Sequence, residues 1–409
     1  MTRRATVRAL VLVVGLGSAA LATASTPGGL DSSCFVSRPG AAQVLVCVPV
    51  GWNGSLVVFA PGYVAPTQGP PEIPWDQLDL ADGSSLPGIV TGLGFAFATT
   101  SYSDGGLAVV PGVHDVQDLV AYFESGHREP DHVYLAGASE GGLVTALAVE
   151  QAPDVFSGGL ATCGPVGDFR RQVDYLGDFR VLFDYFFPGL IPGSAIDPPV
   201  VSRQDWDGRY VPSITAALGA QPARLDALLR VAGAPYDPNE PQTKIETAIG
   251  VLWYNLFAAR DAQAKLGGNP YDNSRRLYLG SGNDFRLNLL VDRFHADPGA
   301  LAAIEEGYQA SGRLSAPLVT LHTTADPVVP YWHEPLYTLK SLRSGLLHTN
   351  LPVFRYGHCA FRAEEALVAL GLLVTEVEGR ALLHPERVLA TDSARRRYES
   401  LARLNGLRQ

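Results

Sequence analysis

The sequence predicts an α/β protein with a mostly parallel sheet, helices on both faces of the sheet, and one helical insertion. Three observations support this fold class. Short β-branched runs alternate with stretches of helical apolar spacing, the alternation is interrupted once, and 46% hydrophobic with 18% charged residues is typical of a globular chain. A helix between two strands returns the chain to the same end of the sheet, so strands that alternate with helices are expected to run parallel.

The expected elements follow one another at ordinary α/β spacing. Expected strands are short runs of β-branched or small apolar residues, and expected helices repeat apolar residues three and four positions apart. The strands are expected at residues 43–50, 55–60, 95–99, 132–136, 156–162, 317–322 and 351–355, and the helices at 113–123, 141–151 and 334–347. Gly51-Trp52-Asn53-Gly54 separates the first two strands and is typical of a hairpin turn.

Residues 165–311 interrupt the alternation and are expected to form a helical cap over the sheet. Their periodicity is helical, as in residues 223–231 and 245–258, and they are rich in aromatic side chains. A simpler interpretation is that most of these aromatics form the core of the cap itself. The chain is therefore divided into a first core part at 25–164, the cap at 165–311, and a second core part at 312–409.

The first 24 residues are typical of a signal peptide. Arg3, Arg4 and Arg8 precede an apolar run over residues 9–21, and Ala22-Thr23-Ala24 provides the small residues of a cleavage site. An uncleaved anchor is the alternative, but the run is short for a membrane span. We expect a secreted protein, extracellular or periplasmic, without a stable membrane anchor.

The net charge argues against one class of partner. A formal charge of −10 without a dense basic patch argues against nucleic-acid binding.

Four cysteines in an oxidising compartment suggest two disulfides out of three possible pairings, with free buried thiols as the alternative. We expect Cys34–Cys47, because they are close in sequence, and hence Cys163–Cys359. No metal-ligand spacing is present, so neither a metal nor a cofactor is expected.

One motif indicates the chemistry. Gly137-Ala138-Ser139-Glu140-Gly141 matches G-x-S-x-G, and it lies between the expected strand 132–136 and the expected helix 141–151. That context is the one in which such a motif forms a nucleophile elbow, with the serine in a strained backbone conformation at the carboxyl end of the sheet. The alternative is a glycine-rich turn into a helix.

A serine nucleophile needs a base and a group that orients the base. Asp326 and His358 each follow an expected strand, in the order Ser, acid, His that this motif predicts. We expect Ser139 to attack, His358 to transfer the proton, and Asp326 to orient the imidazole and stabilise its charge. Asp168 is the alternative acid. His322 precedes the acid and His333 is expected to begin a helix, so neither is preferred as the base.

The oxyanion of a tetrahedral intermediate needs backbone donors. The amide of Glu140 follows the nucleophile. The second donor is expected in Pro61-Gly62-Tyr63, after the strand at 55–60, and Tyr63 is the better choice because Pro61 has no N–H. Tyr102 could add a hydroxyl, but a structural role is favoured.

With these motifs, residues 40–163 and 312–375 resemble the α/β-hydrolase superfamily, and within it secreted bacterial serine hydrolases with a large cap. The similarity rests on the G-A-S-E-G-G, A-D-P-V-V-P and G-H-C runs. Two departures are present: relatives carry His-Gly where this chain has Pro61-Gly62, and tannases and feruloyl esterases bond the cysteine after the histidine to one beside the nucleophile, where this chain has Ala138. The tannase assignment is therefore not carried over, although a Cys163–Cys359 bond could still clamp the histidine loop.

The resemblance implies acyl transfer to water, most often from an ester. The aromatic-rich cap suggests a small or polymeric ester with an apolar or aromatic group. A secreted serine peptidase of the prolyl-oligopeptidase or aminopeptidase kind is the alternative, although no propeller-like repeat precedes the catalytic segment. A non-catalytic binding protein on the same scaffold is the other alternative.

Overall fold

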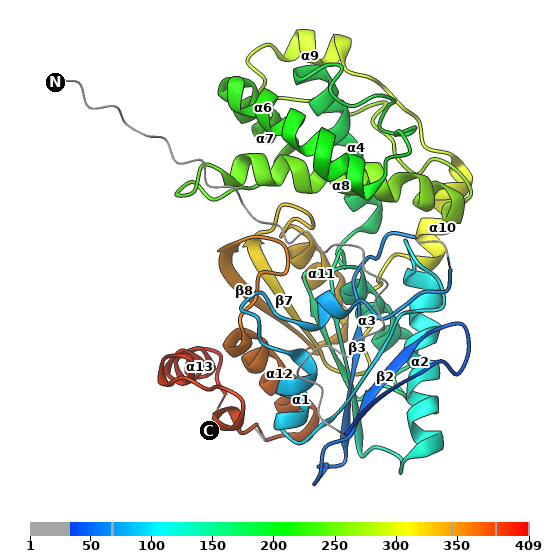
Figure 1. Cartoon of the computed structure of the whole chain (residues 1–409), viewed down its shortest axis with the longest axis vertical. Coiled ribbons are helices and arrows are strands. Elements are labelled where there is room, and N and C mark those ends of the chain that lie inside the picture. The colour runs from blue at the N-terminus through cyan, green and yellow to red at the C-terminus, as the bar shows by residue number, and fades with distance from the viewer. Residues whose placement is uncertain (1–32, 67–68, 346, 381–382, 408–409) are drawn as a thin grey trace, which may run out of the picture.

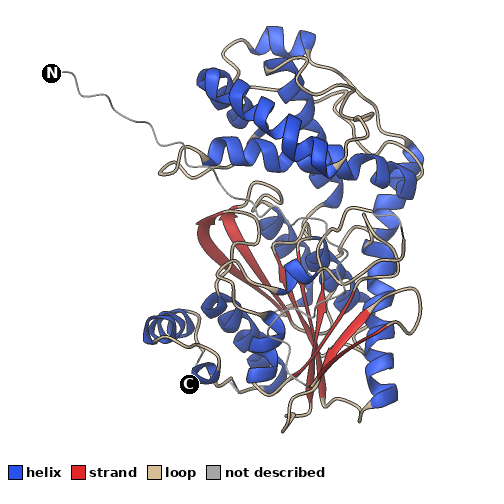
Figure 2. Ribbon diagram, in the orientation of Figure 1, coloured by secondary structure: helices blue, strands red, loops and turns tan. Residues whose placement is uncertain are grey.

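One eight-stranded sheet organises the chain in a computed structural model, which describes residues 33–66, 69–345, 347–380 and 383–407 (Figures 1 and 2). The expected signal peptide, residues 1–24, lies outside the described residues. The strand order is β1-β2-β4-β3-β5-β6-β7-β8. The strands are β1 Cys34–Ser37, β2 Val44–Cys47, β3 Ser55–Ala60, β4 Ala96–Thr100, β5 His132–Ala138, β6 Gly158–Thr162, β7 Leu318–Ala325 and β8 His348–Tyr356.

Neighbouring strands from β4 to β8 pair in parallel, whereas the β1–β2 and β2–β4 pairs at one edge of the sheet are antiparallel. The prediction that the first two long strands form a hairpin was wrong. β4 lies between them, with Ala98 opposite Val46 of β2 on one side and Val58 of β3 on the other. The turn at 51–54 carries the chain past the start of β4, where the Asn53 amide donates to the Gly94 carbonyl (2.9 Å).

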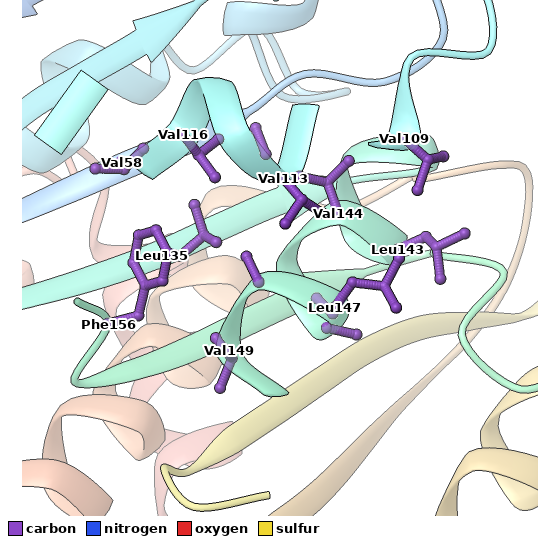
Figure 3. Close-up of a cluster of buried hydrophobic side chains, with 14 of the residues drawn as sticks. Val58, Val109, Val113, Val116, Leu135, Leu143, Val144, Leu147, Val149 and Phe156 are labelled. Atoms are coloured by element: carbon purple, nitrogen blue, oxygen red, sulfur yellow. The ribbon is translucent and has the colours of Figure 1, made fainter. Parts of the chain in front are cut away.

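The strands bury both faces, as expected for a parallel sheet. Along β3, Leu56 and Val58 pack on one side and Val57 and Phe59 on the other, because successive side chains of a strand point to opposite faces. Figure 3 shows the first of these two cores, where the sheet meets two helices. The helices on this side are α2 Val109–Gly126, α3 Glu140–Gln151 and α11 His333–Ser341, and those on the other are α1 Leu86–Gly92, α12 Ala363–Glu378 and α13 Asp392–Leu404.

The chain between β6 and β7 is helical and lies over the end of the sheet to which β7 and β8 run (Figure 1). It has a core of its own, and most of its aromatic side chains are buried there, Phe179 and Phe183 completely. The simpler interpretation of these aromatics is therefore confirmed for most of them. The helices are α4 Phe169–Phe186, α5 Arg203–Asp205, the π-helical η2 Trp206–Tyr210, α6 Val211–Ala220, α7 Pro222–Ala232, α8 Thr243–Leu266, α9 Asp284–Leu290 and α10 Pro298–Gly307.

Short 3₁₀ segments complete the described structure: η1 Trp75–Leu78, η3 Leu342–Ser344 and η4 Pro385–Arg387. Among the described residues, no helix combines the length and the apolar character needed to cross a membrane.

Both expected disulfides are present. Cys34 and Cys47 are opposite one another in the β1–β2 ladder, and Cys163 after β6 is bonded to Cys359 after β8. The first bond joins residues 13 apart in the sequence and the second joins residues 196 apart. The second therefore restricts the unfolded chain far more strongly.

We expect the two disulfides to contribute unequally to stability. In the chain-entropy model, loss of the Cys163–Cys359 bond lowers the free energy of unfolding by about 5 kcal/mol, and loss of the Cys34–Cys47 bond lowers it by about 3 kcal/mol. Urea denaturation of the two double Cys→Ser variants measures both values. Equal losses, or a larger loss for the short loop, would contradict this expectation.

Candidate active site

Ser139 lies at a strained turn between β5 and α3. The strand ends at Ala138 and the helix begins at Glu140, so Ser139 alone makes the turn. Its φ of +57° and ψ of −118° are unfavourable for a residue with a side chain. The Ser139 amide donates to the Thr162 carbonyl (2.9 Å) and the Ser139 carbonyl accepts from Gly142 (2.9 Å), so hydrogen bonds to β6 and α3 hold the conformation.

The two flanking glycines are required by contact. A Cβ at Gly137 would lie 2.1 Å from the Gly141 carbonyl oxygen, and a Cβ at Gly141 would lie 2.0 Å from the carbonyl oxygen of Ala60. Backbone atoms cannot move aside as a flexible side chain can. The elbow predicted from the motif is therefore present, and the motif glycines permit the close packing of β3, β5 and α3.

The structure brings the three predicted catalytic side chains together. His358 Nε2 lies 2.9 Å from Ser139 Oγ, and His358 Nδ1 lies 2.7 Å from Asp326 Oδ2. Asp326 directly follows β7, and His358 follows β8, which is parallel to β7 and beside it. Both side chains therefore reach the same edge of the sheet as Ser139.

Asp326 is fully buried and tightly held. Its Oδ1 accepts hydrogen bonds from the amides of Val328 (2.8 Å) and Val329 (2.9 Å). Burial alone would raise the pKa of Asp326, but His358 and His322 lower it to about 2. The carboxylate is therefore ionised at neutral pH and can orient the imidazole and balance its charge.

The alternative acid and the alternative histidines do not contact Ser139. Asp168 caps the N-terminus of α4, where it accepts from the Arg171 amide (3.1 Å). His333 begins α11, as expected, and its Nδ1 accepts from the amides of Gly167 and Asp168. His322 is completely buried on β7, behind Asp326.

Two backbone amides remain open beside the serine. Within the described residues, the amides of Tyr63 and Glu140 have no hydrogen-bond acceptor. The Gly62 amide, in contrast, donates to Gln77 Oε1 (2.6 Å), and a Cβ at Gly62 would lie 3.2 Å from Ser139 Cβ. This arrangement agrees with the choice of Tyr63 and Glu140 as oxyanion donors, which remains a prediction.

Tyr102 has a structural environment, as favoured. Its buried hydroxyl donates to the carbonyl of Pro61 (2.9 Å), so it supports the loop that carries Gly62 and Tyr63.

The side chain of Glu140 is buried beside the serine. Burial raises its pKa to about 8, although the hydrogen bond from the Ala108 amide and the charge of Lys265 act in the opposite direction. The carboxyl group is therefore mostly protonated at neutral pH. A neutral side chain at this position adds no negative charge beside a developing oxyanion.

The Cys163–Cys359 disulfide links the loops around the serine and the histidine. Cys163 follows Thr162, whose carbonyl accepts from the Ser139 amide, and Cys359 follows His358. The two sulfur atoms and a ring nitrogen of His358 lie within 4.8 Å of one another. Both sulfurs are in the covalent bond, so neither is free as a thiolate ligand for a metal ion.

Two hollows meet at Ser139. The first, with about 910 Å³ of empty space, runs between the core and the cap helices α4 and α8. The second, with about 1010 Å³, contains His358. We call them the cap cavity and the histidine cavity. The cap cavity is lined by residues that include Leu107, Phe169, Val173, Leu176, Ala258, Ala259 and Ala262, and the histidine cavity by residues that include Gln77, Leu80, Leu86, His358 and Phe361.

The cap also forms hydrogen bonds to the loop that follows Asp326. No sequence pattern indicated these contacts. Gln172 Nε2 donates to the Val328 carbonyl (2.8 Å), and the Tyr175 hydroxyl donates to the Pro327 carbonyl (2.7 Å). Both side chains belong to α4. No local motif marks them, since each contact joins residues more than 150 positions apart.

Comparisons with known proteins agree with this fold. Residues 90–175, which include the elbow, match the model of the prolyl oligopeptidase family. No curated protein sequence matches the chain. The chain has the α/β-hydrolase fold, and the predicted resemblance to serine hydrolases of that superfamily is confirmed.

Solved structures with a similar arrangement include esterases, a lipase and a peptidase. Feruloyl esterase B from Aspergillus oryzae is 15% identical over 84% of this chain and 80% of its own, with a TM-score of 0.48. Candida antarctica lipase A in its closed state is 13% identical over 88% and 82%, with a TM-score of 0.46. Pyrococcus horikoshii acylaminoacyl peptidase is 13% identical, with a TM-score of 0.38, and the match covers 80% of this chain but 37% of the peptidase.

We expect Glu140→Gln to stabilise the protein increasingly as the pH rises from 5 to 8. A carboxyl group with a raised native pKa binds its proton more tightly when folded, so the native state loses stability as the pH rises from about 4.5, where the unfolded group titrates, to about 8. Urea denaturation of both proteins at each pH measures the difference. Glu124→Gln, at an exposed position of α2, is the control, and a difference for Glu140→Gln that is constant with pH would contradict the prediction.

Proposed function

We propose that this serine hydrolase of the α/β-hydrolase superfamily cleaves carboxylic esters through an acyl-enzyme on Ser139. The single observation that carries the proposal is the continuous hydrogen-bonded chain Ser139–His358–Asp326, with its 2.9 Å and 2.7 Å contacts. A hydroxyl group is a poor nucleophile until a base removes its proton, and this geometry supplies the base and its orienting carboxylate.

The steps follow from the geometry. Ser139 Oγ attacks the ester carbonyl while His358 Nε2 takes the hydroxyl proton, and Asp326 stabilises the imidazolium that forms. The amides of Tyr63 and Glu140 stabilise the oxyanion, and His358 returns the proton to the departing alcohol. Water then attacks the acyl-enzyme by the same route in reverse, which releases the acid and restores Ser139.

The position of His358 supports a proposal for how the two sides of the substrate are arranged. The leaving group must be within reach of the ring nitrogen that protonates it, and His358 lines the histidine cavity but not the cap cavity. We therefore place the alcohol in the histidine cavity and the acyl group in the cap cavity.

The lining of the cap cavity favours an apolar acyl group. Its walls are mostly aliphatic and aromatic, and Glu140 is the one ionisable carboxyl group among the described lining residues. Because burial keeps that group mostly protonated at neutral pH, it provides little charge to bind the ammonium group of an aminoacyl substrate. An apolar or aromatic ester fits this chemistry better than an aminopeptidase substrate.

A serine peptidase is the second candidate, because residues 90–175 match the prolyl oligopeptidase family. The same triad would then cleave an amide bond, and His358 would protonate an amine leaving group.

We also propose that the protein acts outside the cytoplasm. Two disulfides with no free cysteine among the described residues are typical of an oxidising compartment. The signal-peptide pattern of residues 1–24 supports the same location.

Ser139→Ala should lower the turnover rate by a factor on the order of 10⁶ without unfolding the protein. The assay compares p-nitrophenyl esters with aminoacyl anilides under the same conditions. Ester hydrolysis that requires Ser139 supports the proposal, whereas faster hydrolysis of the anilides by the wild-type protein would favour the peptidase. Ester turnover that persists in Ser139→Ala would overturn the assignment of the nucleophile.

Ala259→Phe should shorten the preferred acyl chain. Ala259 is on α8 and lines the cap cavity, so a phenyl ring there would fill space that a long chain needs. We expect kcat/KM for an octanoyl ester to fall about tenfold or more relative to that for an acetyl ester. Ala264→Phe, at an exposed position of the same helix, is the matched control. If Ala259→Phe instead discriminated between alcohols of different size, the assignment of the two cavities would be reversed.

A further inference from the structure

A second histidine lies directly behind the acid of the triad. His322 is on β7, four residues before Asp326, and its ring is completely buried. Its Nε2 lies 3.5 Å from Asp326 Oδ2 and 2.8 Å from the carbonyl oxygen of Val329. Its Nδ1 lies 2.9 Å from Glu334 Oε1. The ring therefore lies between two buried carboxyl groups.

The hydrogen bonds define the protonation of this ring. A carbonyl oxygen can only accept, so Nε2 carries a proton. Glu334 Oε2 accepts hydrogen bonds from the Thr320 hydroxyl (2.6 Å) and from Nδ2 of the Asn350 side chain (2.6 Å). This arrangement suits an ionised carboxylate. With Glu334 Oε1 accepting as well, from the Nδ1–H of His322, both ring nitrogens carry a proton and the ring is an imidazolium.

The electrostatic balance agrees with this assignment. Burial by itself lowers the pKa of His322, but the hydrogen bonds and charges of Asp326 and Glu334 outweigh burial and raise that pKa to about 10. A buried cation between two carboxylates leaves one negative charge, whereas a neutral ring would leave two buried negative charges without compensation.

His322 also fixes the backbone that holds the acid. Its Nε2–H binds the Val329 carbonyl, and the Val329 amide binds Asp326 Oδ1. One imidazolium therefore acts on the acid through its charge and through the loop from Asp326 to Val329.

We propose that His322 is a positioning residue of the triad: a charged imidazolium, held by Glu334, that keeps Asp326 ionised and oriented toward His358. This inference rests on the proposed function, because it assigns His322 to the support of the proposed Ser139–His358–Asp326 chemistry. The buried chain of groups then extends from Ser139 through His358, Asp326 and His322 to Glu334.

The other titratable groups around the ring do not replace its charge. His333 of α11 is neutral, because its Nδ1 accepts two amide protons and burial lowers its pKa well below the usual value. Burial also lowers the pKa of His348 of β8, which contacts Thr320. Tyr331 packs edge-on against His322 (5.8 Å between centroids), and burial raises the pKa of its hydroxyl. On the far side of Asp326 lies His358, the base of the proposed triad.

The first test is the pH dependence of kcat/KM in His322→Gln. Without the cation, the His358–Asp326 pair should hold its proton more tightly, so the acidic limb of the profile should move to higher pH by about one unit. Activity on that limb should therefore fall about tenfold more than activity at the plateau. His333→Gln is the matched control, because it changes an equally buried but neutral histidine and should leave the limb in place. An unmoved limb in His322→Gln would overturn the positioning role.

The second test measures the charge without any assay of activity. In ¹⁵N-histidine-labelled protein at pH 8, both ring nitrogens of His322 should show the chemical shifts of an imidazolium. These signals are assigned by their loss in His322→Gln and by their change in Glu334→Gln. A neutral tautomer at this pH would overturn the proposal. Since this readout needs no turnover, it separates failure of the inference from failure of the proposed hydrolase function.

A third measurement keeps the role of Glu334 testable. His322→Gln leaves the Glu334 carboxylate buried without its cation, so the double variant His322→Gln/Glu334→Gln should have a higher free energy of unfolding than His322→Gln alone. If the second substitution gave no recovery, or lowered stability further, Glu334 would not be the carboxylate that holds the charge.

Discussion

The parallel arrangement of β5, β7 and β8 is the constraint on which the rest of the site depends. Because the carboxyl ends of parallel strands meet at one edge of a sheet, residues 139, 326 and 358 lie together although they are far apart in the chain. The strained turn at Ser139 places its hydroxyl at that edge, and Gly137 and Gly141 allow the neighbouring backbones to approach closely enough to hold the strain.

Burial of charge is the second theme of the structure. Asp326 and Glu334 are almost fully removed from water, and each would be unfavourable there without a cation and hydrogen-bond donors. Backbone amides of the acid's own loop, His322 and the side chains of Thr320 and Asn350 satisfy these groups. Glu140 takes the other solution, in which a buried carboxyl group keeps its proton. The site therefore combines charged and neutral carboxyl groups within one small region.

The sequence predicted the parts of the site that depend on local pattern. Ser139 is marked by its glycines and by the strand–turn–helix context, while Asp326 and His358 are marked by their positions after strands. Tertiary pairing decided the rest. The expected hairpin was wrong because β4 inserts between β2 and β3, and turn residues alone do not specify which strands pair. Gln172 and Tyr175 of the cap, and the partnership of His322 with Glu334, depend on contacts between separate elements that no short motif records.

Labelling with a fluorophosphonate, followed by peptide mapping, tests the central claim most directly. The probe reacts with a serine only where a base activates the hydroxyl and donors stabilise the oxyanion. We predict a single adduct on the peptide that contains Ser139, formed by the wild-type protein and lost in His358→Ala. An unmodified Ser139, or labelling that is equally fast without His358, would contradict the account.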